Sequence, residues 1–156
     1  MELIPSFTIN HEELLPGIYV SRVDKIGEEY CTTFDIRMKK PNREPVIHQN
    51  AMHTIEHIIA TFLRESERKD EIIYWGPMGC LTGSYLIMKG RLKGEDIYSL
   101  IIDAFEFLAG FEGEVPGAKP KECGNYLLHD LNMAKYEAAL YVKALKESPC
   151  FTYPEA

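Results

Sequence analysis

The sequence lacks long apolar segments and has no recognisable targeting segment at its N-terminus. Its longest mainly apolar run covers residues 97–111 and is interrupted by Asp103 and Glu106. A membrane-spanning helix needs about 20 predominantly apolar residues, so this run predicts a helix of a folded core instead. Residues 1–5 contain no basic stretch followed by an apolar one. We therefore expect no signal peptide, no membrane partner and a cytoplasmic location.

Positive charge is also scarce. The chain has 17 lysine and arginine residues against 24 aspartate and glutamate residues, which gives a formal net charge of −7. This excess of negative charge argues against nucleic acid or an anionic membrane as the main partner, because both would repel it. A small polar metabolite is the better match.

Cysteine is present, but not in the paired spacing of common zinc and redox motifs. The four cysteines are Cys31, Cys80, Cys123 and Cys150, and no two of them form a C-x-x-C pair. This spacing argues against a zinc ribbon and a thioredoxin-type motif. In a reducing cytoplasm these residues are expected to be free thiols, available as metal ligands or catalytic groups.

The chain does contain the pattern of an α+β protein. Its 156 residues are 46% hydrophobic and 26% charged, which predicts one domain, residues 1–156, with a sizeable core. Apolar periodicity predicts strands over 18–24, 30–38, 72–75 and 84–92, and helices over 51–66, 95–111 and 130–146. Asn50 and Asp130 are the expected N-caps of the first and last helices. These elements do not alternate as β-α-β units, so we expect an antiparallel sheet packed with helices.

The most informative motif is His53-Thr54-Ile55-Glu56-His57, near the start of the expected 51–66 helix. Four residues make about one helical turn, so both imidazoles project from one face at a spacing that suits a single metal ion. Glu56 would lie beside such a metal rather than on it. The H-x-x-E-H pattern is known from inverzincin peptidases, but alone it fits two surface histidines equally well.

A catalytic metal site usually has three protein ligands and one open position, so a third ligand must come from elsewhere. Cys123 is the best candidate, because it lies in a loop beside a glycine and a thiolate binds soft divalent ions well. His129 competes for this role. Its position just before the last helix is also typical of an ordinary polar residue, and we favour that interpretation.

Cys80 and Arg37 are two further candidates for chemistry. Cys80 lies in the turn over residues 76–83, which contains three glycines and a proline. Such a turn can expose a sulfur to backbone N–H groups that favour its thiolate, or it can simply accommodate a small residue. Arg37 falls on the polar side of the 30–38 strand, where it is either a surface charge or a clamp for a carboxylate.

Several ordered blocks of the chain resemble one family, the S-ribosylhomocysteine lyases (LuxS). The blocks are Ser6-Phe-Thr-Ile-Asn-His11, Phe34-Asp-Ile-Arg37 followed by Pro41-Asn42, His53-Thr-Ile-Glu-His57, Pro77-Met-Gly-Cys80 with Thr82-Gly83, and Cys123-Gly124 with Leu128-His129-Asp130-Leu131. They extend over most of the chain with compatible spacing, so the resemblance is far more specific than H-x-x-E-H alone. It weakens the peptidase interpretation.

The resemblance implies an α+β homodimer whose two active sites lie at the subunit interface. It implies Fe(II) as the native metal, with zinc or cobalt as replacements, and metal ligands at His53, His57 and Cys123. The family's general acid–base groups correspond to Glu56 and Cys80. Its substrate-binding residues correspond to Ser6, His11 and Arg37, with Arg37 also near the catalytic thiol.

The implied reaction is cleavage of S-ribosylhomocysteine to homocysteine and 4,5-dihydroxy-2,3-pentanedione, the precursor of autoinducer-2. A metal polarises the substrate carbonyl, Cys80 moves protons while the carbonyl migrates along the sugar chain, and Glu56 serves as base for the β-elimination. One segment departs from the family pattern. Tyr74-Trp75-Gly76 stands where the family has an Asp and a Ser ahead of Pro-Met-Gly-Cys, with Tyr74 at the Asp position, so ribose contacts are expected to differ there.

Two other functions are compatible with these residues. One is a small metallohydrolase in which Glu56 activates a metal-bound water, and such an enzyme would have little need for Cys80. The other is a binding protein with a structural metal. That function would require a closed shell of four ligands, whereas the sequence offers three convincing ones.

Overall fold

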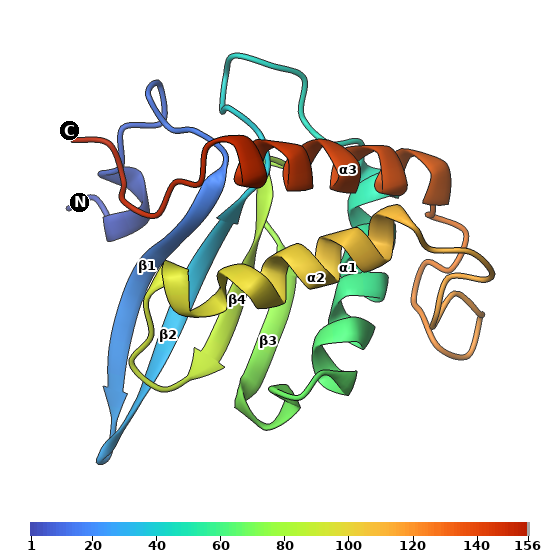
Figure 1. Cartoon of the computed structure of the whole chain (residues 1–156), viewed down its shortest axis with the longest axis horizontal. Helices are drawn as coiled ribbons and strands as arrows, with labels where there is room; N and C mark the ends of the chain where they lie inside the picture. Colours follow the sequence, from blue (N-terminus) through green and yellow to red (C-terminus); the bar gives the residue numbers. More distant parts are fainter. Residues whose placement is uncertain (156) are drawn as a thin grey trace.

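A four-stranded antiparallel sheet forms the centre of the protein, and three α-helices pack against it (Figure 1). The computed structural model describes residues 1–155. The strands are β1 (Gly17–Ile26), β2 (Glu29–Arg37), β3 (Ile72–Pro77) and β4 (Gly83–Lys89). Their order in the sheet is β1-β2-β4-β3, with every neighbouring pair antiparallel. The expected α+β class with an antiparallel sheet is confirmed.

The helices are α1 (Gln49–Glu65), α2 (Tyr98–Ala109) and α3 (Leu131–Glu147). Helix α2 packs along α3, and α1 packs against β3 and both other helices. Short 3-10 helices cover Pro5–Phe7, Lys69–Glu71 and Gly94–Ile97. The last of these replaces the first turn of the helix expected over 95–111. Gly94 approaches β1 so closely there that an added Cβ would lie 2.4 Å from the Ile18 carbonyl oxygen.

The two expected N-caps differ in outcome. Asp130 caps α3 as expected, with its side chain accepting a hydrogen bond from the Met133 amide at 3.0 Å. The prediction for Asn50 is wrong, because α1 begins at Gln49, two residues before the expected start at 51, and His48 is its cap. The chain is already anchored at Ile47, whose amide donates to the Leu81 carbonyl at 3.0 Å and whose side chain is fully buried.

The hydrophobic core lies between the sheet and the helices. Phe34 and Ile36 of β2 and Leu86 of β4 point into it and are fully buried. Because side chains alternate along a strand, Asp35 and Arg37 point to the opposite face of the sheet. Both chain termini lie near the β1 edge of that sheet (Figure 1). The terminal segments are thus placed to cover part of the face that the helices leave open.

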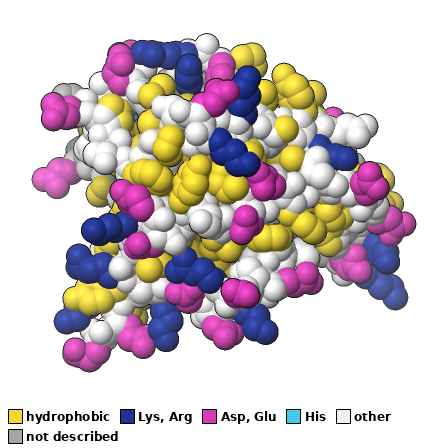
Figure 2. Space-filling view, viewed as in Figure 1, with side chains coloured by type: hydrophobic (Ala, Val, Ile, Leu, Met, Phe, Trp, Pro, Cys, Tyr) yellow, Lys and Arg dark blue, Asp and Glu magenta, His cyan; other side chains and the backbone are white. Residues whose placement is uncertain are grey.

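The surface on the helix side mixes side chains of different kinds. Figure 2 shows lysine and arginine interspersed with aspartate, glutamate and apolar groups on that face, rather than gathered by sign. Among residues 1–155, none of the helices combines the length and apolarity that a bilayer span requires.

Candidate active site

Helix α1 presents the two histidines of the H-x-x-E-H motif on one face. The rings of His53 and His57 are 4.5 Å apart between centroids and nearly perpendicular, at 84°. On the other side of the helix, Ile55, Ile58 and Ile59 are fully buried in the core. This apolar stripe fixes the rotation of α1 and thereby the direction of both imidazoles.

Backbone carbonyls set the orientation of both rings. Nδ1 of His53 lies 2.6 Å from the Leu128 carbonyl oxygen, and Nδ1 of His57 lies 2.8 Å from the Pro116 carbonyl oxygen. A carbonyl can only accept, so each Nδ1 carries the ring proton and each Nε2 keeps a free lone pair. This is the tautomer that binds a metal through Nε2, with the outer hydrogen bond usual for metal-ligating histidine.

The loops that supply these carbonyls orient the two histidines, a role that the sequence did not indicate. Gly117 follows Pro116 and adopts a left-handed conformation, with φ of +70°. An added Cβ there would lie 3.1 Å from Nδ1 of His57. Sequence reasoning missed Pro116 and Leu128, because every residue has a carbonyl. The glycine beside Pro116 was the one available hint.

Cys123 and His129 join the two α1 histidines in one cluster. One ligand atom from each of the four residues can be chosen so that all lie within 4.8 Å of one another. The Cys123 sulfur lies 3.5 Å from Nε2 of His53 and accepts from the Asn125 amide at 3.4 Å. The thiolate is the metal-binding form of cysteine, and this sulfur faces the imidazole of His53. The structure thus brings the three expected ligands together.

His129 precedes α3 as expected, but its ring is part of the cluster, so the interpretation as an ordinary polar residue is incomplete. The ring stacks on His53 with centroids 4.2 Å apart, and its Nδ1 lies 3.0 Å from Oγ1 of Thr54. Burial, and then the nearby His53 and His57, lower the pKa of His129 to about 4, so it is neutral at pH 7. Its Nε2 is buried without a hydrogen-bond partner among residues 1–155.

The donor set fits a divalent transition-metal ion. Neutral imidazole nitrogens and a thiolate sulfur are ligands typical of zinc, iron(II) and cobalt(II). The buried, unpartnered Nε2 of His129 points to the same conclusion. Leaving such a group unsatisfied costs about 1–3 kcal/mol, a cost that binding of an ion in the cluster can offset.

A hollow of about 330 Å³ opens beside the cluster, within the range of small-molecule sites. Its lining comes from α1, from the β3–β4 turn and from the segment before α3, and comprises Gln49, Met52, His53, Glu56, Pro77, Leu81, Asn125 and Leu128. Glu56 and His53 therefore face the same space. A bound metabolite can contact a carboxylate and a candidate metal ligand at once.

The turn between β3 and β4 presents Cys80 at the surface. Its side chain is exposed, while the turn is held by hydrogen bonds from the Met78 amide to the Gly83 carbonyl at 2.9 Å and from the Leu81 amide to the Met78 carbonyl at 3.0 Å. Leu81 adopts a left-handed φ of 60°, which is uncommon for a residue other than glycine. The sulfur is therefore exposed in a tight turn, as the functional interpretation of Cys80 requires.

Arg37 is buried, with 3% of its surface exposed, so the surface-charge interpretation is wrong. Its Nε and Nη2 donate to the Asp35 carboxylate at 3.0 and 2.7 Å, and its Nη1 lies 3.9 Å from the Cys80 sulfur. Burial opposes the charge, but Asp35 outweighs burial and keeps the pKa of Arg37 above its ordinary value. The edge that would clamp a substrate carboxylate in bidentate fashion is already occupied.

The N-terminal candidates lie elsewhere on the chain. Ser6 lines a second hollow of about 360 Å³ with Tyr74 and Tyr85, and this hollow shares no lining residue with the one beside Glu56. His11 is half-buried, with Nδ1 2.9 Å from the Ile9 carbonyl oxygen. A single chain therefore does not bring Ser6 into the hollow of the metal cluster.

The departure at Tyr74-Trp75-Gly76 includes a close contact within β3. The Tyr74 ring lies over Gly76, two residues further along the strand, and a Cβ on Gly76 would be 2.0 Å from the Tyr74 hydroxyl. A side chain at position 76 would therefore displace the half-exposed Tyr74 ring from this position. As it lies here, Tyr74 lines the same hollow as Ser6.

An antiparallel sheet with packed helices, a histidine and cysteine cluster and an adjacent hollow are together the features of a small metal-dependent enzyme. Comparison with known proteins makes this specific. The chain belongs to the LuxS family, because the family model described as S-Ribosylhomocysteinase (LuxS) matches residues 4–150.

The chain is similar to curated members of the family over most of its length. It is 64% identical over 148 residues to the S-ribosylhomocysteine lyase of Phocaeicola vulgatus, covering 94% of this chain and 92% of that protein. It is 58% identical over 144 residues to the S-ribosylhomocysteine lyase of Porphyromonas gingivalis, covering 92% and 91%. It is 57% identical over 139 residues to that of Clostridium beijerinckii, covering 88% and 87%.

Proposed function

We propose that this protein is an S-ribosylhomocysteine lyase, a carbon–sulfur lyase that releases homocysteine and 4,5-dihydroxy-2,3-pentanedione, the autoinducer-2 precursor. The observation that best supports the site is the cluster of His53, His57 and Cys123 beside a hollow that Glu56 lines. Family membership and the names of the relatives support the substrate. The reaction is that of a cytoplasmic enzyme acting on a small metabolite.

His53, His57 and Cys123 hold one metal ion per chain in this proposal, Fe(II) natively, with zinc or cobalt as substitutes. When bound, the ion supplies Lewis-acid polarisation of the substrate's carbonyl oxygen. The hydrogen bonds from the two imidazole Nδ1 atoms to backbone carbonyls support this role, because they direct both Nε2 lone pairs into the cluster.

Cys80 and Glu56 move the protons. After the ribose opens to an aldehyde, Cys80 takes the proton from the carbon next to the carbonyl and returns a proton to the former carbonyl carbon. Two such steps move the carbonyl from C1 to C2 and then to C3. Glu56 then removes the C4 proton, the electron pair forms a C4–C5 double bond, and the C5–S bond breaks. The resulting C4 enol tautomerises, with its hydroxyl proton lost and C5 protonated, to give 4,5-dihydroxy-2,3-pentanedione. The sulfur leaves with its electrons and is protonated to give homocysteine.

The active form in this proposal is a homodimer with active sites at the subunit interface, to which Ser6 and His11 contribute substrate contacts, while Arg37 lies behind Cys80 with its nitrogens bonded to Asp35 and Thr82. Two observations support it. The hollow that Ser6 lines is separate from the hollow beside Glu56 within one chain. The hollow that Ser6 lines also has exposed apolar side chains around it, including Ile4 at 54% and Tyr74 at 50% exposure. A second copy would cover these groups.

Thiol release from S-ribosylhomocysteine tests the proposal directly. Purified, metal-loaded protein is incubated with this substrate, and the released thiol is titrated with a chromogenic disulfide. We expect stoichiometric homocysteine from the wild type, at least a hundredfold slower release from Cys80→Ala, and normal release from the control Cys31→Ala. Absence of release from the wild type would refute the function. Full activity of Cys80→Ala would refute the role of that thiol in moving protons during carbonyl migration.

A further inference from the structure

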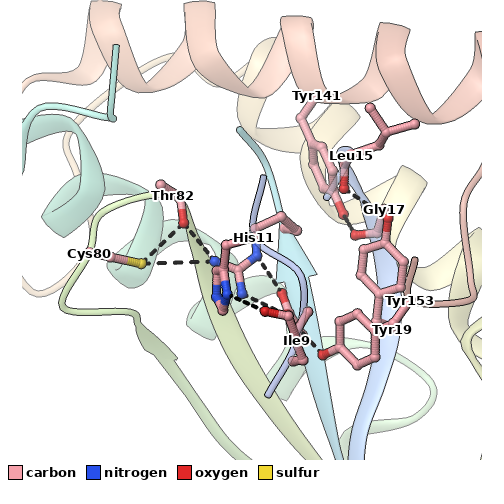
Figure 3. Close-up of polar contacts among 11 residues, drawn as sticks. Ile9, His11, Leu15, Gly17, Tyr19, Cys80, Thr82, Tyr141 and Tyr153 are labelled. Atoms are coloured by element: carbon pink, nitrogen blue, oxygen red, sulfur yellow. Dashed lines mark hydrogen bonds and ion pairs between the residues drawn. The ribbon is translucent and has the colours of Figure 1, made fainter. Parts of the chain in front are cut away.

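The side chain of Thr82 lies between Arg37 and the sulfur of Cys80. Its Oγ1 accepts a hydrogen bond from Nη1 of Arg37 at 2.7 Å and lies 3.1 Å from the Cys80 sulfur (Figure 3). By contrast, Arg37 itself is 3.9 Å from that sulfur. Thr82 is therefore the closer of the two polar side chains to the proposed catalytic atom, and it is only 4% exposed.

The polarity of these contacts determines what Thr82 can do. A guanidinium has donors only, so the Thr82 hydroxyl must accept from Arg37. The hydroxyl proton is then free to point away from Arg37, toward the Cys80 sulfur. A donor that itself receives a charge-assisted hydrogen bond is polarised and becomes a stronger donor. The arrangement suits an ionised sulfur, which can only accept.

We propose that Thr82 is a positioning residue that donates a hydrogen bond to the Cys80 thiolate and transmits to it the influence of the Arg37 charge. Cys80 is exposed and would otherwise be stabilised mainly by water. Through Thr82, the buried cation acts on an atom that it does not itself contact at normal hydrogen-bond length. The catalytic consequence rests on the proposed role of Cys80 as the base, but the hydrogen bond itself does not.

The backbone and the C-terminal segment hold this link in place. The Thr82 carbonyl accepts from the amides of Met38 and Lys39 at 2.9 and 3.0 Å, which fixes the threonine next to the end of β2. On the far side of Arg37, the Asp35 carboxylate also accepts from the Tyr153 hydroxyl at 2.9 Å. Arg37 is thus fixed from both sides, with one nitrogen left for Thr82.

The other ionisable groups near the sulfur do not compete for this role at neutral pH. Tyr85 on β4 is close enough to Cys80 for their charges to interact, and burial followed by the negative charge of Asp35 raises the pKa of Tyr85 above its ordinary value. Burial and Asp35 likewise raise the pKa of Tyr153. Both phenols are therefore neutral at pH 7, and Arg37 is the positive group linked to Cys80 through Thr82.

Alkylation of Cys80 as a function of pH tests the link without any substrate. Metal-loaded, full-length protein is treated with iodoacetamide, and the adduct on Cys80 is followed by peptide mass spectrometry, with Cys31 as an internal reference. We compare wild type with Thr82→Val, which removes the hydroxyl at nearly constant shape, and with Thr82→Ser, which keeps it. Because the thiolate is the reactive form, loss of the donor should slow the reaction about tenfold near pH 7 in Thr82→Val.

Thr82→Ser is expected to stay within about threefold of the wild type, because the donor is retained. The matched control is Thr32→Val, which removes another buried threonine hydroxyl, one that donates to the Gly90 carbonyl at 2.7 Å instead. It should leave Cys80 alkylation unchanged. Wild-type rates in Thr82→Val, or equal losses in Thr82→Val and Thr82→Ser, would overturn the proposal. Thiol release assayed on the same variants separates this outcome from failure of the lyase function.

Discussion

Single residues in the loops around the cluster are under tight steric constraint. Gly117 and Gly113 both have positive φ, +70° and +107°, so a side chain is strained at either position. Only at Gly117 would an added Cβ also contact His57, and around Gly113 there is open space. We predict that Gly117→Ala lowers metal affinity at least tenfold, by displacing His57, while Gly113→Ala changes it less than threefold. Competition with a chromophoric chelator measures both.

The two glycine variants also control for each other. Both lose stability through backbone strain, so a difference in metal affinity reports the contact with His57 rather than general loosening of the loop. Equal metal affinities in the two variants would contradict the idea that the loop beside His57 holds this ring in place for the metal.

His129 provides a second prediction at the residue scale. Its ring stacks on His53, so His129→Phe keeps an aromatic ring there and removes both nitrogens. With three ligands remaining, we expect this variant to bind one metal ion per chain, but 10–100-fold more weakly than the wild type. Metal content after dialysis and chelator competition give stoichiometry and affinity.

The comparison variant for His129 is Cys123→Ala. It should lose stoichiometric metal, because only two of the three proposed ligands, His53 and His57, would remain. If His129→Phe lost metal as completely as Cys123→Ala, His129 would be an essential ligand. If it bound as tightly as the wild type, its unpartnered Nε2 would have no part in the site.

At the scale of secondary-structure elements, we predict different losses of stability for substitutions at the N-termini of α1 and α3. Asp130→Ala removes the capping hydrogen bond to the Met133 amide and should cost about 1 kcal/mol of unfolding free energy. Asn50→Ala should cost less than about 0.5 kcal/mol, because Asn50 is not the N-cap of α1 and because its bonds to His48 and Thr54 are made by its backbone, which alanine retains. Urea denaturation of metal-free protein measures both. A larger loss for Asn50→Ala than for Asp130→Ala would contradict the caps described.

Element types could be predicted from the sequence because most of the strands and helices bury a single face. Periodicity placed α1 and α3 to within two residues, since their apolar stripes are regular. It extended the last strand to residue 92, whereas β4 ends at Lys89. The chain turns at Gly90, with φ of +103°, and a lone glycine in an apolar run does not reveal that turn.

The candidate site was predictable where the chemistry resides in side-chain type. H-x-x-E-H, Cys80 and Cys123 were found because histidine, carboxylate and thiol are distinctive groups. Burial of Arg37 was not predictable, because a strand that alternates Asp35 and Arg37 with apolar residues looks like one with a solvated face. Thr82, which accepts from Arg37, is 45 residues away in sequence, and Tyr153, which donates to the ion-pair partner Asp35, is 118 residues from that aspartate.

At the scale of the whole molecule, we predict that the open face of the sheet is the interface of the dimer. Ile87 on β4 lines the same hollow as Ser6 and is half-buried in the single chain. We predict that Ile87→Lys shifts the protein from twice its chain mass of 17.9 kDa to the monomer, because a charge would be buried in the interface. Analytical ultracentrifugation measures the change.

The matched control for the dimer is Leu140→Lys, which places the same charge on α3 at a side chain that is 41% exposed. It should leave the association state unchanged. A dimeric Ile87→Lys protein with an intact fold would place the interface elsewhere. A monomeric wild type that still releases homocysteine would remove the need for shared active sites.

The separation of the cluster along the chain has a consequence for how the protein is made. His53 and Cys123 are 70 residues apart, and the cluster joins α1 to the segment that leads into α3. A growing chain folds from its N-terminus, so the complete cluster cannot form until most of the polypeptide has been synthesised. Metal capture is therefore a late event in biogenesis. Once bound, the ion would tie the two halves of the chain together, so that metal shortage in the cell would lower the amount of folded protein as well as its activity.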